Sequence, residues 1–378
     1  MRNMRQGSQF TMIAVVVGLT LGGASQAAAA KPLKVFILAG QSNMQGNVDV
    51  STFDSMADDP KTAPILKEMR DANGKPRVCE KVWMSAICRA YDDTTEITGR
   101  LTTGFGASTH QIGPEFTFGL YMEKALNEPI LIIKTSWGGR SLATDFRPPS
   151  AGPYVVSQRS WDWAKQHHED LKAIQERVDK TPRGVSYRLM IEHVRKVLAD
   201  IKRVMPDYDP KQGYELAGFV WFQGFNDMID EWTYDDRMNG GYAEYGRLFE
   251  HFIRDVRKDL SAPKMPFVIG VMGIGGVKEG PPQSYFRQFQ AAPAWLPEFK
   301  GNVVAVQTAP FWDDDLAALQ ARAEKNEKLT PDEQKRLKAG VSNGGYHYLG
   351  AAKIMAPIGK AFADAMVNLQ KAQREEKP

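Results

Sequence analysis

The sequence predicts an α/β protein, a three-layer sandwich in which helices cover both faces of a mainly parallel sheet. Five short apolar runs have the length and β-branched content of buried strands: 33–39, 130–134, 216–222, 266–272 and 302–307. Amphipathic segments with helical spacing lie between or after them, at 113–126, 186–204, 242–260 and 349–369. Strands that alternate with helices favour a parallel sheet covered on both sides. Five such strands fit a flavodoxin-like sandwich.

The first strand ends in a turn that carries a serine. The apolar run stops at Gly40, and Ser42 follows among small and amide residues. Ligands of open α/β sheets bind at the carboxyl ends of the strands. Ser42 would therefore present both its backbone N–H and its hydroxyl to a substrate. The plainer alternative is that Ser42 only caps the next helix.

Residues 1–30 have the order of a secretory signal peptide. Arg2 and Arg5 precede an apolar stretch at 10–21, and small residues fill 22–30. The apolar stretch is short for a membrane span. We therefore expect a periplasmic or secreted product with no membrane association after this segment is removed. The formal net charge of +3 includes the two arginines and gives no reason to expect a nucleic-acid partner.

The rest of the chain is expected to form one domain, residues 31–370, followed by a charged tail at 371–378. Three inserts interrupt the strand and helix pattern, near 49–110, 147–184 and 316–339. The last insert has the pattern of a helical pair, with Thr330 as an N-cap and Pro331 as the first helical residue.

The chain has two cysteines, Cys79 and Cys88. In an oxidising compartment, two cysteines so close in sequence usually form a local disulfide. We expect this bridge to hold a surface excursion between about residues 48 and 106. The spacing is not CxxC and no histidine is adjacent, so thiol catalysis and metal binding are disfavoured.

Further segments supply the residue types that ester hydrolysis requires, which are a nucleophile, a base and donors for the oxyanion. The Gly138-Gly139 pair follows the second strand, and glycines let backbone N–H groups approach a ligand closely. Asn226 follows the third strand. His347 precedes the last helix, and a histidine has an ordinary pKa near working pH.

The segment Gly40-Gln41-Ser42-Asn43-Met44 resembles the nucleophile segment of the SGNH-hydrolase superfamily. It is most similar to the branch that contains carbohydrate acetylesterases and sialate O-acetylesterases. Three further segments match in order, so the resemblance covers roughly residues 33–366. It implies the SGNH fold and a serine esterase that removes O-acetyl groups from an oligo- or polysaccharide without a cofactor. Ser42 would be the nucleophile and His347 the base.

The same resemblance implies the oxyanion donors. These are the N–H of Gly139 and the side-chain amide of Asn226, with Gln223 as the alternative donor. Phe225 stands where the branch often has a glutamate. We also expect Gln41, Gln223, Arg140 and Glu115 at the substrate site. Arg140 would read a charged or hydroxylated substituent, and Glu115 would either contact substrate or tie loops together.

The acid of the expected triad is not evident. The superfamily usually has an aspartate three residues before the histidine, but position 344 is a glycine. Asp313, just after the last strand, is our choice, and Asp227 is a further candidate. For Asp314 and Asp315, a place at a helix N-terminus is at least as good an interpretation as the role of triad acid. In the other alternative, His347 works in a dyad and is held by a backbone carbonyl.

Two other functions stay open at this level. One is a lipase or thioesterase of the same superfamily, and the other is a non-catalytic glycan-binding protein on this scaffold. The chain has no HExxH, no clustered His and Cys, and no Asp-x-Asp-x-Asp loop, which disfavours a metal centre. It also lacks P-loop and GxGxxG spacing, which disfavours nucleotide binding.

Overall fold

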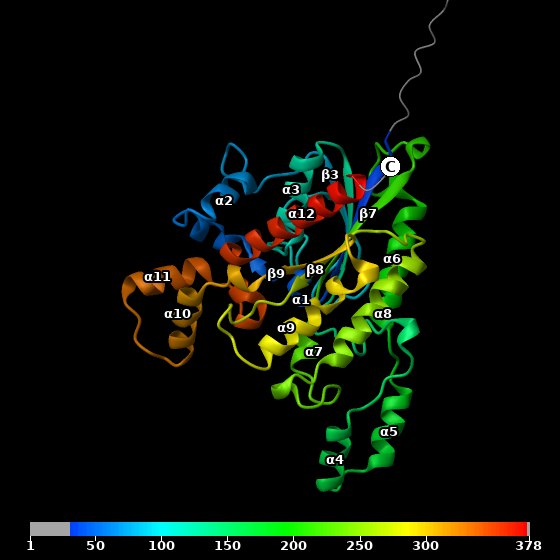
Figure 1. Ribbon diagram of the computed structural model, residues 1–378. Helices are drawn as coiled ribbons and strands as arrows, with labels where there is room; N and C mark the ends of the chain where they lie inside the picture. The colour runs from blue at the N-terminus through cyan, green and yellow to red at the C-terminus, as the bar shows by residue number, and fades with distance from the viewer. Residues whose placement is uncertain (1–30, 376–378) are drawn as a thin grey trace, which may run out of the picture.

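The computed structural model describes residues 31–375, so the expected signal peptide lies outside the described residues. Its centre is a seven-stranded sheet in the order β4-β3-β6-β1-β7-β8-β9 (Figure 1). The strands are β1 Leu33–Gly40, β3 Val82–Ile87, β4 Ile97–Arg100, β6 Ile130–Ser136, β7 Tyr214–Phe222, β8 Phe267–Val271 and β9 Val303–Gln307. Only β4 runs antiparallel to its neighbour. The predicted α/β fold with a mainly parallel sheet is confirmed.

Helices cover both faces of this sheet (Figure 1). On one face lie α6 (Val185–Ala199) and α8 (Ala243–Asp259), and on the other lie α3 (Glu115–Leu126) and α12 (Ala352–Glu375). Alternate residues of β1 belong to the two apolar clusters between these layers. Because both sides of β1 are buried, its sequence is a continuous apolar run rather than an alternating one.

All five predicted strands are present, as β1, β6, β7, β8 and β9. The insert at 49–110 differs from the expectation, because it adds β3 and β4 to one edge of the main sheet. At the two ends of this insert, β2 (Val48–Asp49) pairs with β5 (Gln111–Ile112) in a small second sheet. This insert is therefore part of the core and not only a surface excursion.

The expected disulfide does not form: Cys79 and Cys88 are both buried and free. They lie at opposite ends of β3, whose six residues span roughly 20 Å in extended form. A disulfide requires Cα atoms within about 4.4–6.8 Å of each other. The close sequence spacing was misleading because a strand, and not a turn, separates the two cysteines.

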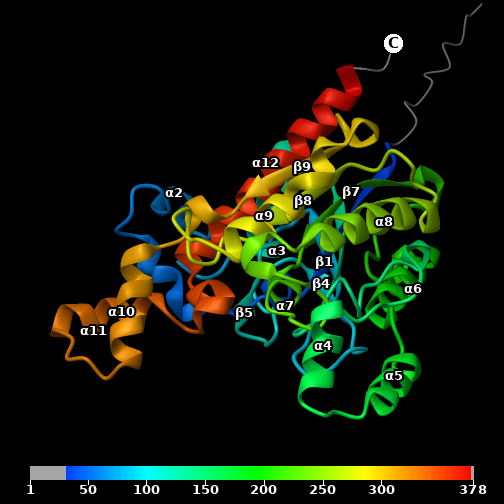
Figure 2. The same cartoon turned by 60° about the horizontal axis from the view of Figure 1, so that its bottom comes forward.

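The other two inserts are helical. Helices α4 (Gln158–Gln166) and α5 (Leu171–Lys180) project from the sandwich as an arm (Figures 1 and 2). The predicted helical pair is present as α10 (Asp314–Glu324) and α11 (Pro331–Gly340). Thr330 caps α11 in a capping box with Glu333, as its sequence indicates.

The remaining helices are short. They are α1 (Ser42–Gln45), α2 (Ala63–Met69), α7 (Phe225–Met228) and α9 (Gln283–Ala291). Helix α12 continues to Glu375, so most of the expected charged tail is helical, and 376–378 lie outside the described residues. Between residues 31 and 375, no helix has the length and apolar character needed to cross a membrane.

Candidate active site

The central strands β1, β6 and β7 end at the same level of the sheet. Gly40, the last residue of β1, is in register with Ser136 of β6 and with Phe222 of β7. The loops that follow these strands therefore leave from one edge of the sheet. These three loops carry Ser42, Gly139 and Asn226. The strand order brings together residues that are far apart in the sequence, at the edge where α/β sheets bind ligands.

Ser42 is the first residue of the short helix α1. The N-cap position belongs to Gln41, so the hydroxyl of Ser42 is not used for capping, and the plainer alternative is wrong. A Cβ at Gly40 would lie 2.1 Å from the carbonyl oxygen of Phe222, so only glycine allows the chain to turn here against β7. Nε2 of Gln41 lies 3.5 Å from Oγ of Ser42.

The side chain of Gln41 ties the serine turn to the loop after β7. Its Oε1 accepts hydrogen bonds from the backbone N–H groups of Gly224 (3.1 Å) and Asn226 (3.3 Å). It also accepts one from Nε2 of Gln223 at 3.3 Å. Gln41 is 1% exposed, so it fixes the position of Ser42 rather than offering a surface to substrate. The expected substrate contact is corrected to a positioning role.

Asp227 ties the same loop to the loop after β6. Its carboxylate is fully buried and accepts hydrogen bonds from the N–H groups of Leu142 (2.7 Å) and Ala143 (3.0 Å). The hydroxyl of Tyr234 (2.7 Å) and Nε2 of Gln223 (2.5 Å) also donate to it. Burial raises the pKa of Asp227 to about 6, and these four hydrogen bonds oppose that rise. Its neighbours are loop donors and not His347, so Asp227 holds the glycine loop.

The two amides proposed as oxyanion donors differ in their surroundings. Gln223 is buried, and its Nε2 donates to Arg140 O (3.1 Å) as well as to Gln41 and Asp227, while its Oε1 accepts from Tyr245. Within residues 31–375, the side chain of Asn226 has no hydrogen-bond partner. The amide of Gln223 is therefore committed to the protein, which leaves Asn226 as the candidate donor.

Gly139 lies in the exposed turn after β6. Its φ of +74° is in the left-handed region, where glycine is favoured, and a Cβ there would meet no atom within 4 Å. Its backbone N–H has no partner among the residues the structure describes. The turn therefore presents a free N–H group to the open side of the sheet edge.

His347 reaches the site on a strained turn, the 3-10 segment Gly345–Gly350. The next two residues, Tyr348 and Leu349, have φ values of +53° and +62°, which are costly for residues with side chains. The side-chain amide of Asn43 donates to the carbonyl of Tyr346 at 3.2 Å. A hydrogen bond therefore joins Asn43, the residue after Ser42, to Tyr346, the residue before His347.

Nδ1 of His347 lies 2.9 Å from Oδ1 of Asn343, which occupies the position expected of a triad acid. Burial lowers the pKa of His347 to about 4, and no charged neighbour contributes to that shift. The sequence reasoning searched for a carboxylate and so passed over Asn343. The available signal was an amide four residues before the histidine, in a glycine-rich turn.

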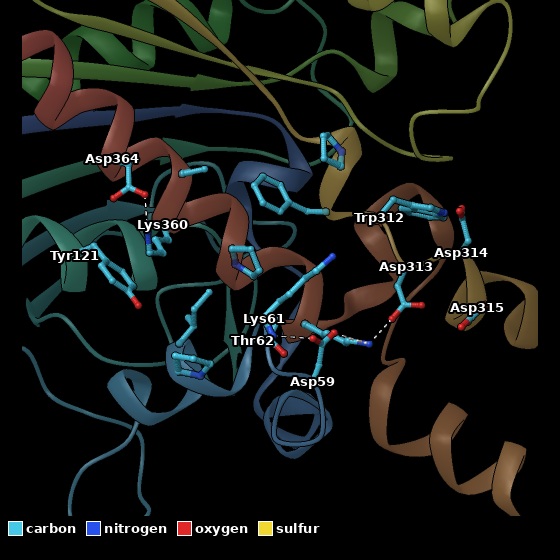
Figure 3. A pocket seen from close by; sticks show the side chains of 17 residues that line it. Asp59, Lys61, Thr62, Tyr121, Trp312, Asp313, Asp314, Asp315, Lys360 and Asp364 are labelled. Carbon is cyan, nitrogen blue, oxygen red and sulfur yellow. Dashed lines mark hydrogen bonds and ion pairs between the residues drawn. The ribbon is translucent and has the colours of Figure 1, made fainter.

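Asp313, our expected triad acid, is engaged elsewhere. Its side chain caps α10 by accepting the N–H of Leu316 at 2.9 Å, and it pairs with Lys353 at 2.9 Å. It lines a cavity of about 670 Å³ with Asp59 and Tyr121 (Figure 3). The helix-capping preference of an aspartate decided its position. Asp314 and Asp315 lie in the first turn of α10, as their alternative interpretation predicts.

Glu115 does not contact substrate, because it is fully buried in an ion pair with Lys134 of β6 at 2.6 Å. Lys134 Nζ also donates to the carbonyl of Gln45, the last residue of α1, at 2.9 Å. Glu115 accepts the N–H of Gly113 at 2.9 Å. Of the two expected roles for Glu115, tying loops together is the one that fits.

Arg140, expected to read a substrate substituent, pairs with two carboxylates of the protein. Its guanidinium lies 2.5 Å from Asp93 Oδ2 and 3.2 Å from Asp145 Oδ1. Its charge is therefore compensated within the loop after β6 and the neighbouring insert. This geometry gives Arg140 a structural role beside the candidate oxyanion glycine.

A buried serine–histidine contact lies elsewhere in the molecule. Oγ of Ser85 is 2.9 Å from Nε2 of His193, and it also donates to Glu96 at 2.7 Å. Ser85 has no exposed surface, and burial lowers the pKa of His193 to about 4. Because substrate has no access to Ser85, this trio joins β3 to α6 and is not a second active site.

Among the described residues, no group of three or more His, Cys, Asp or Glu side chains is placed to hold a metal ion. The mainly parallel sheet, with its serine, glycine and asparagine loops at one edge, is consistent with the expected SGNH-type sandwich. The family model for the carbohydrate esterase, sialic acid-specific acetylesterase, matches residues 32–325, and the chain belongs to this family. The protein is therefore a carboxylic ester hydrolase of the carbohydrate O-acetylesterase class, and its substrate is an acetylated carbohydrate.

Two solved structures are similar to this chain at 16% sequence identity. One is a protein of Arabidopsis thaliana, with a TM-score of 0.44, covering 89% of this chain and 98% of that chain. The other is a carbohydrate acetylesterase of Xanthomonas citri, with a TM-score of 0.41, covering 78% of this chain and 57% of that chain. Among curated proteins, none matches.

Proposed function

We propose that this esterase removes O-acetyl groups from a carbohydrate through a covalent acetyl-enzyme on Ser42. The observation that carries the proposal is the common register of β1, β6 and β7. It gathers Ser42, Gly139 and Asn226 at one edge, where the turn with His347 is bonded to the turn with Ser42 through Asn43. These residues supply a nucleophile, a base and oxyanion donors in one place.

In the first half of the reaction, Oγ of Ser42 attacks the acetyl carbonyl carbon and its proton passes to Nε2 of His347. Nδ1 is engaged by Asn343, so Nε2 is the nitrogen available for this transfer. The tetrahedral intermediate then collapses, the bond from the acetyl carbon to the sugar oxygen breaks, and His347 returns the proton to that oxygen. Water, activated by the same nitrogen, hydrolyses the acetyl-enzyme in the second half.

The negative oxygen of the tetrahedral intermediate requires donors that need no rearrangement. The N–H groups of Ser42 and Gly139 and the side-chain amide of Asn226 have no hydrogen-bond partners among the described residues. Removing one such donor in a serine hydrolase typically lowers kcat by about 10²–10³-fold. We expect a loss of this order for Asn226→Ala.

Asn343 can orient His347 but supplies no negative charge. The imidazolium formed during catalysis is therefore less stabilised than it would be beside a carboxylate. The low pKa of His347, about 4, keeps it neutral and ready to accept a proton at neutral pH. The enzyme would thus work with a correctly oriented but weak base.

The decisive experiment compares the wild type with Ser42→Ala on an acetylated oligosaccharide and an aryl acetate, together with labelling by a fluorophosphonate. We expect label on Ser42 only in the wild type, and a loss of at least about 10³-fold in kcat for the variant. Full activity of Ser42→Ala would refute the mechanism. A series of acyl chain lengths tests the lipase or thioesterase alternative, which requires a preference for chains longer than acetyl.

We further propose that residues 1–30 direct export and are removed. The basic, apolar and small-residue segments of this region support that proposal. The mass of the protein recovered from the periplasm or the medium tests it, because loss of about 30 residues is expected. Recovery of the uncleaved chain inside the cell would contradict it.

A further inference from the structure

We propose that Tyr346 and Phe225 form an aromatic platform that binds the sugar ring of a neutral acetylated pyranoside beside Ser42. This inference rests on the proposed function and specifies which substrate that site takes. The two ring centroids are 6.1 Å apart, and the ring planes are inclined by 39°. Tyr346 is 51% exposed, so about half of its surface is open to solvent.

The platform joins the two loops that flank the nucleophile. Tyr346 directly precedes His347, and the two rings meet edge-on with centroids 4.5 Å apart. Phe225 directly precedes Asn226 at the start of α7. The backbone of Tyr346 is held by Asn43, next to Ser42. A sugar ring stacked on this pair would therefore contact both the loop that carries His347 and the loop that carries Asn226.

The position of the Tyr346 ring depends on the glycine at position 344. A Cβ at Gly344 would lie 2.6 Å from Cε1 and 3.0 Å from Cζ of Tyr346. The backbone of Gly344 is extended, with φ −70°, so the glycine is needed for space and not for its dihedral angle. Any side chain at 344, including an aspartate, would push the ring away. The ring of Tyr346 therefore occupies the space that a carboxylate side chain at position 344 would need.

Charges near the glycine turn favour a sugar without a carboxylate. Arg140 follows Gly139, and it faces both Asp93 and Asp145. The three groups together carry a net negative charge. The carboxylate of a glucuronide bound there would meet that negative charge, and the guanidinium of Arg140 is already paired with Asp93 and Asp145. A neutral sugar that stacks on aromatic faces has no such cost.

The test uses three acetate esters with the full-length mature enzyme. They are mono-O-acetylated methyl glucopyranoside, mono-O-acetylated methyl glucuronopyranoside, and ethyl acetate, which has no ring. We expect the wild type to prefer the neutral glycoside over the glucuronide by at least about fivefold in kcat/KM. A preference for the glucuronide would overturn the neutral-sugar part of the proposal.

Tyr346→Ala is expected to lower kcat/KM on the neutral glycoside about tenfold more than on ethyl acetate, mainly through KM. Tyr346→Phe should retain the wild-type value within about threefold, whereas Tyr346→Leu should behave like the alanine variant. The matched control is Tyr214→Ala, since Tyr214 is 45% exposed at the opposite, amino-terminal end of β7. Equal losses on both esters, or no loss on the glycoside, would overturn the platform.

Gly344→Ala provides a second, independent route to the same result. It should displace the ring and lower glycoside hydrolysis, whereas in a Tyr346→Ala background it should have little further effect. Additive losses would contradict the steric link between the two positions. If the wild type cleaves none of the three esters and Ser42 takes no fluorophosphonate, then the proposed function fails. A failure of the platform alone leaves the labelling of Ser42 and ethyl acetate hydrolysis intact.

Discussion

Oδ1 of Asn343 lies 2.9 Å from Nδ1 of His347, and Asn343 also accepts the N–H of Gly344 at 2.8 Å. One neutral side chain therefore stabilises the turn and orients the candidate base. The aspartate expected three residues before the histidine is absent because that position is a glycine. The side chain that orients His347 is instead that of the preceding residue, Asn343, which carries no charge.

Asn343→Asp is expected to raise the pKa of His347. A carboxylate at the same place retains both accepted hydrogen bonds and stabilises the imidazolium, and an opposite charge at this distance raises a pKa by about 1–3 units. Because the neutral histidine is the active form, the acid limb of the kcat/KM profile should move upward from about pH 4. The pH dependence of acetate release measures this shift.

Asp313→Asn is the control for that prediction. Asp313 caps α10 and pairs with Lys353, so its loss should leave the pH profile in place and affect only stability. If Asp313→Asn moved the acid limb and Asn343→Asp did not, Asp313 would be the acid after all.

Asp227→Asn is expected to destabilise the protein by about 2–4 kcal/mol and to lower kcat. The amide cannot accept all four of the hydrogen bonds that the carboxylate receives, so one or more buried donors lose their partner. Two of those donors, Leu142 and Ala143, belong to the glycine loop. Urea unfolding and kcat on ethyl acetate measure the two effects, and unchanged kcat would argue against a positioning role.

The same carboxyl group gives a pH dependence of stability with a defined sign. Burial raises the pKa of Asp227 from 3.8 to about 6. Between these values the folded state binds a proton that the unfolded state does not, so the contribution of this group to stability falls as pH rises from about 4 to 6. The difference in unfolding free energy between Asp227→Asn and the wild type should change in this window and stay constant above it.

Glu115→Gln is expected to cost about 3–5 kcal/mol, because it leaves the charge of Lys134 buried without its partner. The double variant Lys134→Met with Glu115→Gln should be more stable than the sum of the two single changes predicts. The control is Lys180→Met, which breaks an exposed i,i+4 pair with Glu176 and should cost under about 1 kcal/mol. Equal costs for the buried and exposed pairs would contradict this prediction.

Both cysteines should titrate as free thiols. We expect two thiols per chain with a thiol reagent in denaturant without reductant, and a very slow reaction in the folded state. Burial raises the pKa of the Cys79 thiol to about 12 and also raises that of Cys88, so neither forms a reactive thiolate at neutral pH. A change in Tm on adding reductant would instead indicate a disulfide.

The central strands, the main helices and the segments that carry Ser42, Gly139, Asn226 and His347 could be predicted from the amino-acid sequence. These follow from local signals: the period of apolar residues, glycines at strand ends, and a motif of adjacent residues. The capping box at Thr330 belongs to the same class, because every group involved lies within a few residues of the others. Local chemistry was sufficient for these features because their partners are neighbours in the chain.

The side chains that meet across the fold could be identified only from the three-dimensional arrangement of the elements. Whether Asp313 pairs with His347 or with Lys353, and whether Glu115 contacts substrate or Lys134, depends on contacts between elements that composition and spacing do not encode. The two cysteines show the same limit, since nine positions are close in a turn but far apart along a strand. A carboxylate or an amide forms hydrogen bonds with the donors that lie next to it in the folded protein. Those donors depend on how the whole chain packs.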